Sequence, residues 1–215
     1  KDGRDRTAAC CLSSLNLEKY DEWKDDPDMI GDVMRFLDNV LSDFINKAPD
    51  QFKDAKYSAE RERSVGLGVM GFHSFLQKHK IPLESVMAKA WNKKIFKQID
   101  EQVNQASKDL ADERGACPDA AEYGFKERFS NKTAIAPTAS ISIICGGASP
   151  GVEPIAANSY THKTLSGSFN VRNRYLEEIL ETHGKNDDET WSTITTNQGS
   201  VSHLDFLTDL EKDVS

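Results

Sequence analysis

The sequence predicts a helix-rich α/β fold, and a chain of 215 residues is expected to form one domain. Apolar residues recur at helical spacing through residues 1–130, whereas short apolar segments at residues 8–13 and 133–136 are typical of strands. Gly, Pro, Ser and Thr then become dense, so residues 131–215 are expected to begin with loops and extended pieces. Since no flexible spacer separates the two regions, we interpret the second as the site-forming loops of the same domain.

Three long helices are expected in the first region. Residues 29–46 are amphipathic, and Pro49 follows them as a stop signal. A second helix is predicted from Ser58 to Lys78, with Ser58 as its cap and acidic residues close behind. A third is predicted from Leu83 to Glu113, where Gly115 ends it.

Shorter helices are expected near the end of the chain, at Tyr175 to Leu180 and at Asp187 to Thr195. The acidic run from Asn186 to Glu189 could in principle attract a metal ion. We interpret it as a solvated helix start, because acidic side chains suit the positive end of a helix dipole.

Composition limits the partners that the chain can have. The net charge of -8 argues against a nucleic-acid backbone or an anionic membrane surface as the main partner. No apolar run approaches the ~18 to 20 residues that span a bilayer, and no apolar segment typical of a signal peptide follows the polar start. The expected compartment is therefore the cytoplasm.

The cysteines and histidines do not predict a metal site. The four cysteines have no CxxC spacing, and no histidine pattern accompanies them. In a reducing compartment they are expected to be thiols, and a disulfide between the adjacent Cys10 and Cys11 would be strained. By residue type alone, Cys10 is expected only to pack in a core.

Residues 66–71 read Gly-Leu-Gly-Val-Met-Gly and match the G-x-G-x-x-G pattern of dinucleotide-binding loops. That motif requires a buried strand before it and an acidic residue about 20 positions later. A polar helix start is predicted instead at Ser58 to Ser64. We therefore interpret the glycines as small residues on one helix face that allow a neighbouring strand or helix to approach closely.

The most informative segment lies at residues 136–154. An apolar lead-in stops at Pro137, and Thr138, Ser140 and Ser142 follow with only small or aliphatic residues between them. Such a segment can turn sharply and direct several backbone N–H groups and hydroxyls at one point, as a phosphate requires. An ordinary tight loop is the alternative interpretation.

Three motifs occur together: Cys-Cys-Leu-Ser at residues 10–13, Pro-Thr-Ala-Ser at residues 137–140 and Gly-Val-Glu-Pro at residues 151–154. In this order the chain resembles the large, catalytic subunit of aerobic ribonucleotide reductase, from about Asp5 to Val214. The resemblance implies an internal piece of that subunit. It also implies part of a ten-stranded α/β barrel, to which this piece contributes a few strands and several outer helices.

The resemblance assigns roles to individual residues. Cys10 would be one half of a redox pair whose other cysteine lies upstream, and Leu12 would line the substrate cavity. Residues 151–154 would support the substrate loop, with Glu153 structural and not catalytic. The loop for the substrate diphosphate would comprise Pro137, Thr138, Ala139, Ser140 and Ile141.

The implied activity is the reduction of ribonucleoside diphosphates to deoxyribonucleoside diphosphates. A radical from a metal-containing small subunit would pass to an upstream cysteine, which takes a hydrogen from the ribose. The cysteine pair would then supply the reducing equivalents, and thioredoxin or glutaredoxin would restore it. The whole subunit would form a homodimer under allosteric control. This chain would bind no cofactor itself and would be inactive alone.

Three alternatives remain open from the sequence. The first is a reductase that uses adenosylcobalamin in place of the small subunit. The second is a different phosphate-binding enzyme, since a tight loop after a strand is generic. The third is a non-enzymatic helical interaction module built on residues 29–113.

Overall fold

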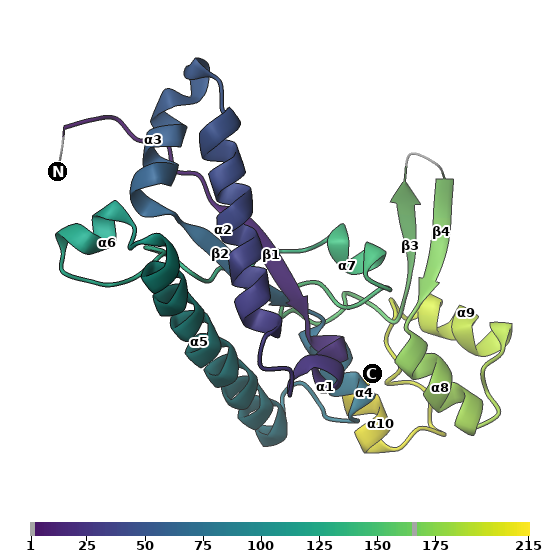
Figure 1. The fold of residues 1–215 in the computed structure, drawn as a ribbon. Coiled ribbons are helices and arrows are strands. Elements are labelled where there is room, and N and C mark those ends of the chain that lie inside the picture. Colours follow the sequence, from purple (N-terminus) through teal and green to yellow (C-terminus); the bar gives the residue numbers. More distant parts are fainter. Residues whose placement is uncertain (1–2, 165–166) are drawn as a thin grey trace.

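The computed structural model describes residues 3–164 and 167–215. Its centre is a parallel pair of strands, β1 (Cys11–Asn16) and β2 (Val65–Met70), in the register from Cys11↔Val65 to Asn16↔Met70 (Figure 1). The chain continues this sheet only briefly at residues 131–134. There Thr133 forms a single parallel bridge with Leu67, and the Leu67 N–H donates to the Lys132 carbonyl at 2.9 Å.

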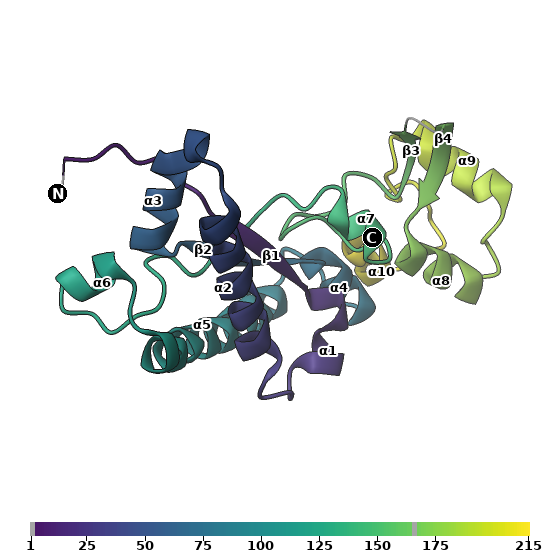
Figure 2. The ribbon, with the colours of Figure 1, turned by 45° about the horizontal axis from the view of Figure 1, so that its top comes forward.

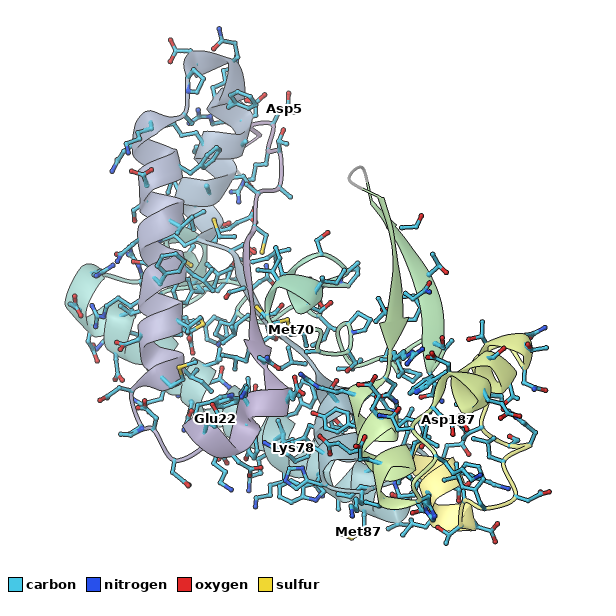
Figure 3. All side chains as sticks on the ribbon, turned by 90° about the vertical axis from the view of Figure 1, so that its right-hand side faces the viewer. Asp5, Glu22, Met70, Lys78, Met87 and Asp187 are labelled. Carbon is cyan, nitrogen blue, oxygen red and sulfur yellow. The ribbon has the colours of Figure 1, made fainter. Side chains whose placement is uncertain are left out.

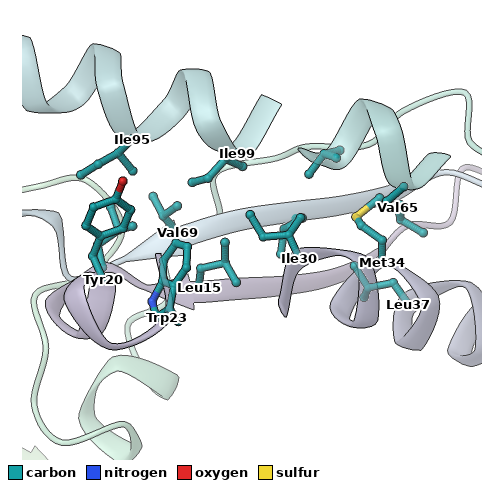
Figure 4. Packing of buried hydrophobic residues seen from close by; sticks show 14 of the residues in the cluster. Leu15, Tyr20, Trp23, Ile30, Met34, Leu37, Val65, Val69, Ile95 and Ile99 are labelled. Carbon is teal, nitrogen blue, oxygen red and sulfur yellow. The ribbon is translucent and has the colours of Figure 1, made fainter. Parts of the chain in front are cut away.

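Helices connect and cover the strand pair. The crossover from β1 to β2 contains η1 (Leu17–Lys19), α1 (Tyr20–Trp23), α2 (Met29–Lys47), η2 (Asp50–Phe52) and α3 (Lys53–Glu62). The segment after β2 contains α4 (Phe72–Lys78), α5 (Val86–Arg114) and α6 (Pro118–Glu122). Helices α2 and α5 pack together, and their apolar side chains join those of alternate strand residues in one core. Figure 4 shows this packing, which includes Leu15, Ile30, Val65, Val69 and Ile95.

The predicted helices at residues 29–46 and 83–113 are confirmed, but the single helix from Ser58 to Lys78 is wrong. Helix α3 ends at Arg63, which adopts the left-handed conformation with φ 43°. Strand β2 follows, and Gly71, with φ 78°, turns the chain into α4. In β2, Val65, Leu67 and Val69 alternate with neighbours that include two glycines, which is the two-residue period of a strand and not a helical one.

The carboxyl-terminal part has a second core. It contains α7 (Ile141–Ile144), the antiparallel hairpin β3 (Ser159–Thr164) and β4 (Gly167–Arg172), α8 (Arg174–Thr182), α9 (Asp188–Thr196) and α10 (Asp209–Val214). The hairpin, α8 and α9 lie at the far side of the molecule from α3 and α6 (Figure 2). The core residues are Leu176, Leu180, Trp191, Ile194, Val201, Leu204 and Leu207.

The expected helices at Tyr175 to Leu180 and Asp187 to Thr195 are confirmed. The side chain of Asp187 caps α9 by accepting from the Thr190 N–H at 2.8 Å, so this acidic run is a helix start. The expected buried strand at residues 133–136 is wrong, because Thr133 makes only one bridge and residues 133–135 are exposed. Their sheet edge has no further strand to cover it among the described residues.

The predicted α/β class is therefore confirmed as a helix-rich α/β fragment, and the described residues form no closed barrel. No helix within the described ranges is both long enough and apolar enough to cross a membrane.

Candidate functional site

The face of the strand pair opposite the helical core carries the candidate redox cysteine. On this face Leu12 pairs with Gly66 and Ser14 pairs with Gly68. A Cβ atom built on Gly66 would lie 3.3 Å from Cys10 Sγ, 2.5 Å from Leu12 Cδ2 and 2.8 Å from the Ala134 Cβ. Cys10, Leu12 and Ala134 thus converge on one glycine, which leaves room for all three side chains.

The four thiols have different surroundings. Cys10 is exposed, and its Sγ lies 3.8 Å from the Cys11 carbonyl oxygen as a weak donor. The pKa of Cys11 is raised, mainly by burial and to a smaller extent by the neighbouring Cys10. Cys117 is fully buried, and burial raises its pKa as well, whereas Cys145 is exposed. Cys10 is therefore accessible at the strand face, unlike the core cysteine that residue type alone would favour.

The candidate phosphate loop is shaped by Thr138. This residue is buried and has φ 55°, so the chain turns sharply directly after Pro137. Its Oγ1 accepts the N–H of Gly151 at 2.8 Å, and its carbonyl accepts the N–H of Ser142 at 3.0 Å. The Thr138 oxygen atoms therefore hold the loop together, and one of them binds the N–H of Gly151, the first residue of the segment 151–154.

Backbone donors are available along the exposed part of the loop. Within the part of the chain that the structure describes, the N–H groups of Ala139, Ser140 and Ile141 have no hydrogen-bond acceptor. All three residues are exposed, and the Ser140 side chain makes no capping hydrogen bond to α7. Such adjacent free donors can receive an anion, since charged acceptors shorten and strengthen hydrogen bonds.

Helix α4 fixes the segment that follows the loop. Ser74 and Ser149 exchange two hydrogen bonds, from Ser74 N–H to Ser149 Oγ at 3.1 Å and from Ser149 N–H to Ser74 Oγ at 2.9 Å. The Gly71 N–H donates to the Ser149 carbonyl at 2.7 Å. The Ile155 N–H lies 3.4 Å from His73 Nδ1. Burial lowers the pKa of His73 to about 4, so the ring is neutral and Nδ1 can accept at neutral pH.

The loop is thus attached to the strand pair at both of its ends. The residues before the loop pass close to Gly68: a Cβ atom added to this glycine would lie 2.1 Å from the Ala134 carbonyl oxygen. The loop exit reaches the end of β1, where Asn16 Nδ2 lies 3.5 Å from the Cys145 carbonyl oxygen. Met70, the last residue of β2, pairs with Asn16 at the second of these attachments, and it lies near the middle of the molecule in Figure 3.

The sequence reasoning missed the residues that hold the loop from outside, namely Asn16, His73, Ser74 and Ser149. No local pattern identifies them, because their contacts join segments 75, 82 or 129 positions apart. The described residues contain no group of three His, Cys, Asp or Glu side chains that could hold a metal ion. His162 and Lys163 could by residue type lie near a phosphate, but we interpret them from the sequence as a surface or capping pair; their side chains lie outside the described set.

Comparison with known proteins relates this geometry to a family. The family model described as the barrel domain of ribonucleotide reductase matches residues 1–127 and 119–214. The ribonucleoside-diphosphate reductase large subunit of Invertebrate iridescent virus 6 is 49% identical over 97% of this chain. The vitamin B12-dependent ribonucleoside-diphosphate reductase of Thermoplasma acidophilum is 36% identical over 85% of the chain and 23% of its own length.

A solved structure agrees with these matches. The alpha subunit of the class Id ribonucleotide reductase of Actinobacillus ureae superposes on 98% of this chain with a TM-score of 0.88 and 40% identity. The chain spans only 22% of the viral relative and 38% of that structure. The resemblance seen in the motifs is confirmed, and the chain belongs to the barrel-domain family of ribonucleotide reductases.

Proposed function

We propose that this chain is the part of a ribonucleoside-diphosphate reductase large subunit that holds the substrate between Cys10 and the loop of residues 137–141. Leu12 lines the cavity beside the ribose, and the diphosphate binds at the N–H groups of Ala139, Ser140 and Ile141. Thr138 and Pro137 shape the loop. The observation that carries the proposal is the convergence of Cys10, Leu12 and Ala134 on Gly66, directly before the loop with its free donors.

Cys10 would act as one of two reducing thiols. As the ribose 2′-hydroxyl leaves as water, two thiols give up two electrons and two protons and become one disulfide. The partner cysteine and the thiyl cysteine that starts the reaction would come from other parts of the subunit. The whole protein would require a metal-containing small subunit as radical source, thioredoxin or glutaredoxin as reductant, and a second copy of itself.

The comparisons favour the type that uses a small subunit over the type that uses adenosylcobalamin. Identity is 49% with a relative described as a large subunit and 36% with a vitamin B12-dependent relative. Neither a generic phosphate-binding enzyme nor a helical interaction module built on residues 29–113 accounts for family membership along nearly the whole chain.

The experiment measures nucleotide binding by the full-length subunit, and single-turnover reduction after its small subunit has been added. Ser140→Asp places a carboxylate among the diphosphate donors and should weaken binding at least about 100-fold, because like charges in a binding site cost several kcal/mol. In Ser140→Asn the new side chain is nearly as large as aspartate but carries no charge, so the affinity of this variant should stay within about fivefold of the wild type. Unchanged affinity of Ser140→Asp would contradict the loop assignment.

Cys10→Ser tests the redox role separately. This variant should bind ribonucleoside diphosphates normally but lose thiol-dependent turnover, because a hydroxyl cannot form the disulfide. Cys11→Ser is the matched control, since the Cys11 side chain belongs to the opposite, helix-packed face of β1. Full turnover by Cys10→Ser, or turnover by residues 1–215 alone, would overturn the proposal.

A further inference from the structure

A buried carboxylate lies just beyond the end of β1 and is not part of the proposed chemistry. Glu18 is only 6% exposed. Its carboxylate forms an ion pair with the Arg174 guanidinium and accepts a hydrogen bond from the Tyr175 hydroxyl. A buried charge is costly unless it is paired, so Arg174 and Tyr175 together make this burial possible.

Arg174 also contacts the exit of the diphosphate loop. Its Nη1 donates to the Gly146 carbonyl oxygen at 3.1 Å, two residues after the end of α7. The preceding carbonyl, of Cys145, lies 3.5 Å from Asn16 Nδ2. Asn16 Oδ1 in turn accepts the Glu18 N–H at 3.1 Å. Two adjacent carbonyls of the loop exit are thus held by side chains anchored at the end of β1.

This arrangement relates the two halves of the candidate site. Strand β1 carries Leu12 and follows directly after Cys10. At its far end Asn16 contacts the loop exit, and Glu18, just beyond β1, pairs with Arg174, which also contacts the loop exit. Because a paired strand is stiff, the loop is kept at a fixed distance from the thiol. A guanidinium suits this task, since its planar fork can donate to a carboxylate and to a carbonyl simultaneously.

We propose that Arg174, paired with Glu18, is a positioning residue that fixes the loop exit against β1 and thereby determines affinity for the ribonucleoside diphosphate. The inference rests on the proposed function of the loop. Arg174 acts through the Gly146 carbonyl and the donors of residues 139–141, and it does not contact the substrate itself. Loss of Arg174 releases the loop exit, so the donors no longer converge on one point.

The test uses the full-length subunit with CDP as the probe, alone for Kd and together with its small subunit and reductant for KM and kcat. Arg174→Met keeps the length of the side chain but removes its hydrogen bonds and charge. We expect KM and Kd for CDP to rise about tenfold and kcat to change less than about twofold, because a misplaced binding group costs ground-state affinity. Arg172→Met is the matched control, since Arg172 pairs with the exposed Asp188 at 3.0 Å and should leave KM unchanged.

A double variant separates positioning from mere stabilisation. Arg174→Met leaves Glu18 buried without its cation, which lowers the melting temperature. Glu18→Gln combined with Arg174→Met removes that unpaired charge, so the melting temperature should recover while KM stays about tenfold high. If Arg174→Met does not fold, the double variant and Arg174→Lys provide the test, and Arg174→Lys should give an intermediate KM because one ammonium holds only one partner well.

An unchanged KM in Arg174→Met would overturn the inference, as would a double variant in which KM and melting temperature recover together. A fall in kcat without a rise in KM would also contradict it. If the wild-type subunit failed to bind CDP, the proposed function itself would be wrong. If it binds CDP and every Arg174 variant binds equally well, only the positioning role fails.

Discussion

Thr138 Oγ1 accepts the backbone N–H of Gly151 at 2.8 Å, across 13 positions of the chain. Both residues adopt positive φ, 55° for Thr138 and 49° for Gly151. This hydrogen bond closes the segment that contains α7 into a compact loop. The same bond satisfies an N–H group that is buried together with Thr138.

Thr138→Val should open this loop. Valine has the shape of threonine but offers no acceptor, so the buried Gly151 N–H loses its partner at a cost of about 1–3 kcal/mol. Hydrogen exchange of the Gly151 amide should become faster, and CDP affinity of the full-length subunit should fall. Thr138→Ser is the control, because it keeps the hydroxyl oxygen. Equal amide protection in the two variants would contradict the closure role.

Gly68→Ala should distort the approach to the loop. The new Cβ would lie 2.1 Å from the Ala134 carbonyl oxygen, a backbone atom that can move only if the backbone of residues 133–135 shifts. We expect a loss of about 1–3 kcal/mol in the free energy of unfolding, as for other overpacked positions. Urea denaturation measures this loss.

Gly31→Ala provides the contrast for the Gly68 variant. Gly31 lies in α2, and an added Cβ would meet nothing within 4 Å. Alanine is the better helix former by up to about 1 kcal/mol, so this variant should be neutral or stabilised. Similar destabilisation by both substitutions would show that steric closeness at Gly68 is not the cause.

Asp38→Asn should strongly destabilise the amino-terminal core. Asp38 is fully buried, and its carboxylate pairs with Arg63 at 2.7 Å, Arg114 at 2.8 Å and Arg128 at 2.9 Å. Removing one partner of a buried ionic network costs about 3–5 kcal/mol. Asp43→Asn, at an exposed pair with Lys47, should change the free energy of unfolding by less than about 0.5 kcal/mol.

The same network predicts an acid response. Burial alone would raise the pKa of Asp38, but hydrogen bonds and charge from Arg128, Arg63 and Arg114 outweigh burial and lower it below 3.8. The unfolded chain therefore takes up this proton first as pH falls. Stability from Asp38 is complete above about pH 5 and is lost as pH falls below 4 towards the folded pKa. Asp38→Asn should lack this component of acid unfolding.

His73 predicts a response at milder pH. Burial lowers the pKa of His73 from 6.5 to about 4. Between these pH values His73 is therefore protonated in the unfolded chain but neutral in the folded chain. Stability should fall by up to about 3 kcal/mol as pH drops from 7 to 4. Urea midpoints of wild type and His73→Asn at pH 7.5 and 4.5 measure this difference, which should shrink in the variant.

Asp38→Asn serves as the control for the His73 measurement, because Asp38 titrates below this window and His73 is intact. Its stability should depend on pH between 7.5 and 4.5 as in the wild type. An equal pH dependence in His73→Asn and wild type would show that another group causes the loss.

The sequence predicted the parts of the fold that local patterns control. Helices α2 and α5 follow from apolar spacing and from the stop signals after them. The region from Ser58 to Lys78 was mispredicted because helical spacing and strand alternation overlap in a short apolar run. Val65, Leu67 and Val69 match the strand period, and the deciding factor is pairing with β1, 54 positions earlier.

The residues of the candidate site were predicted from the sequence, but the contacts that hold the loop in place were not. Family motifs identify Cys10, Leu12 and residues 137–141, and their roles stay predictions that the experiments above address. The structure assigns Thr138 a holding role through Gly151. Contacts such as Asn16 with Cys145 or Arg174 with Glu18 join distant segments, so they leave no periodic or spacing signal in the chain.

The parallel pairing of β1 with β2 also has a consequence for how the molecule forms. The strands are joined through a crossover that contains α2 and α3, and the segment that leads to the candidate loop joins β2 only after residue 130. Contacts between residues far apart in the sequence slow folding, because the chain loses conformational entropy when distant strands meet and gains their hydrogen bonds only afterwards. During synthesis the helices can form first, whereas Cys10 and the candidate phosphate loop come together only after residues 137–141 have left the ribosome.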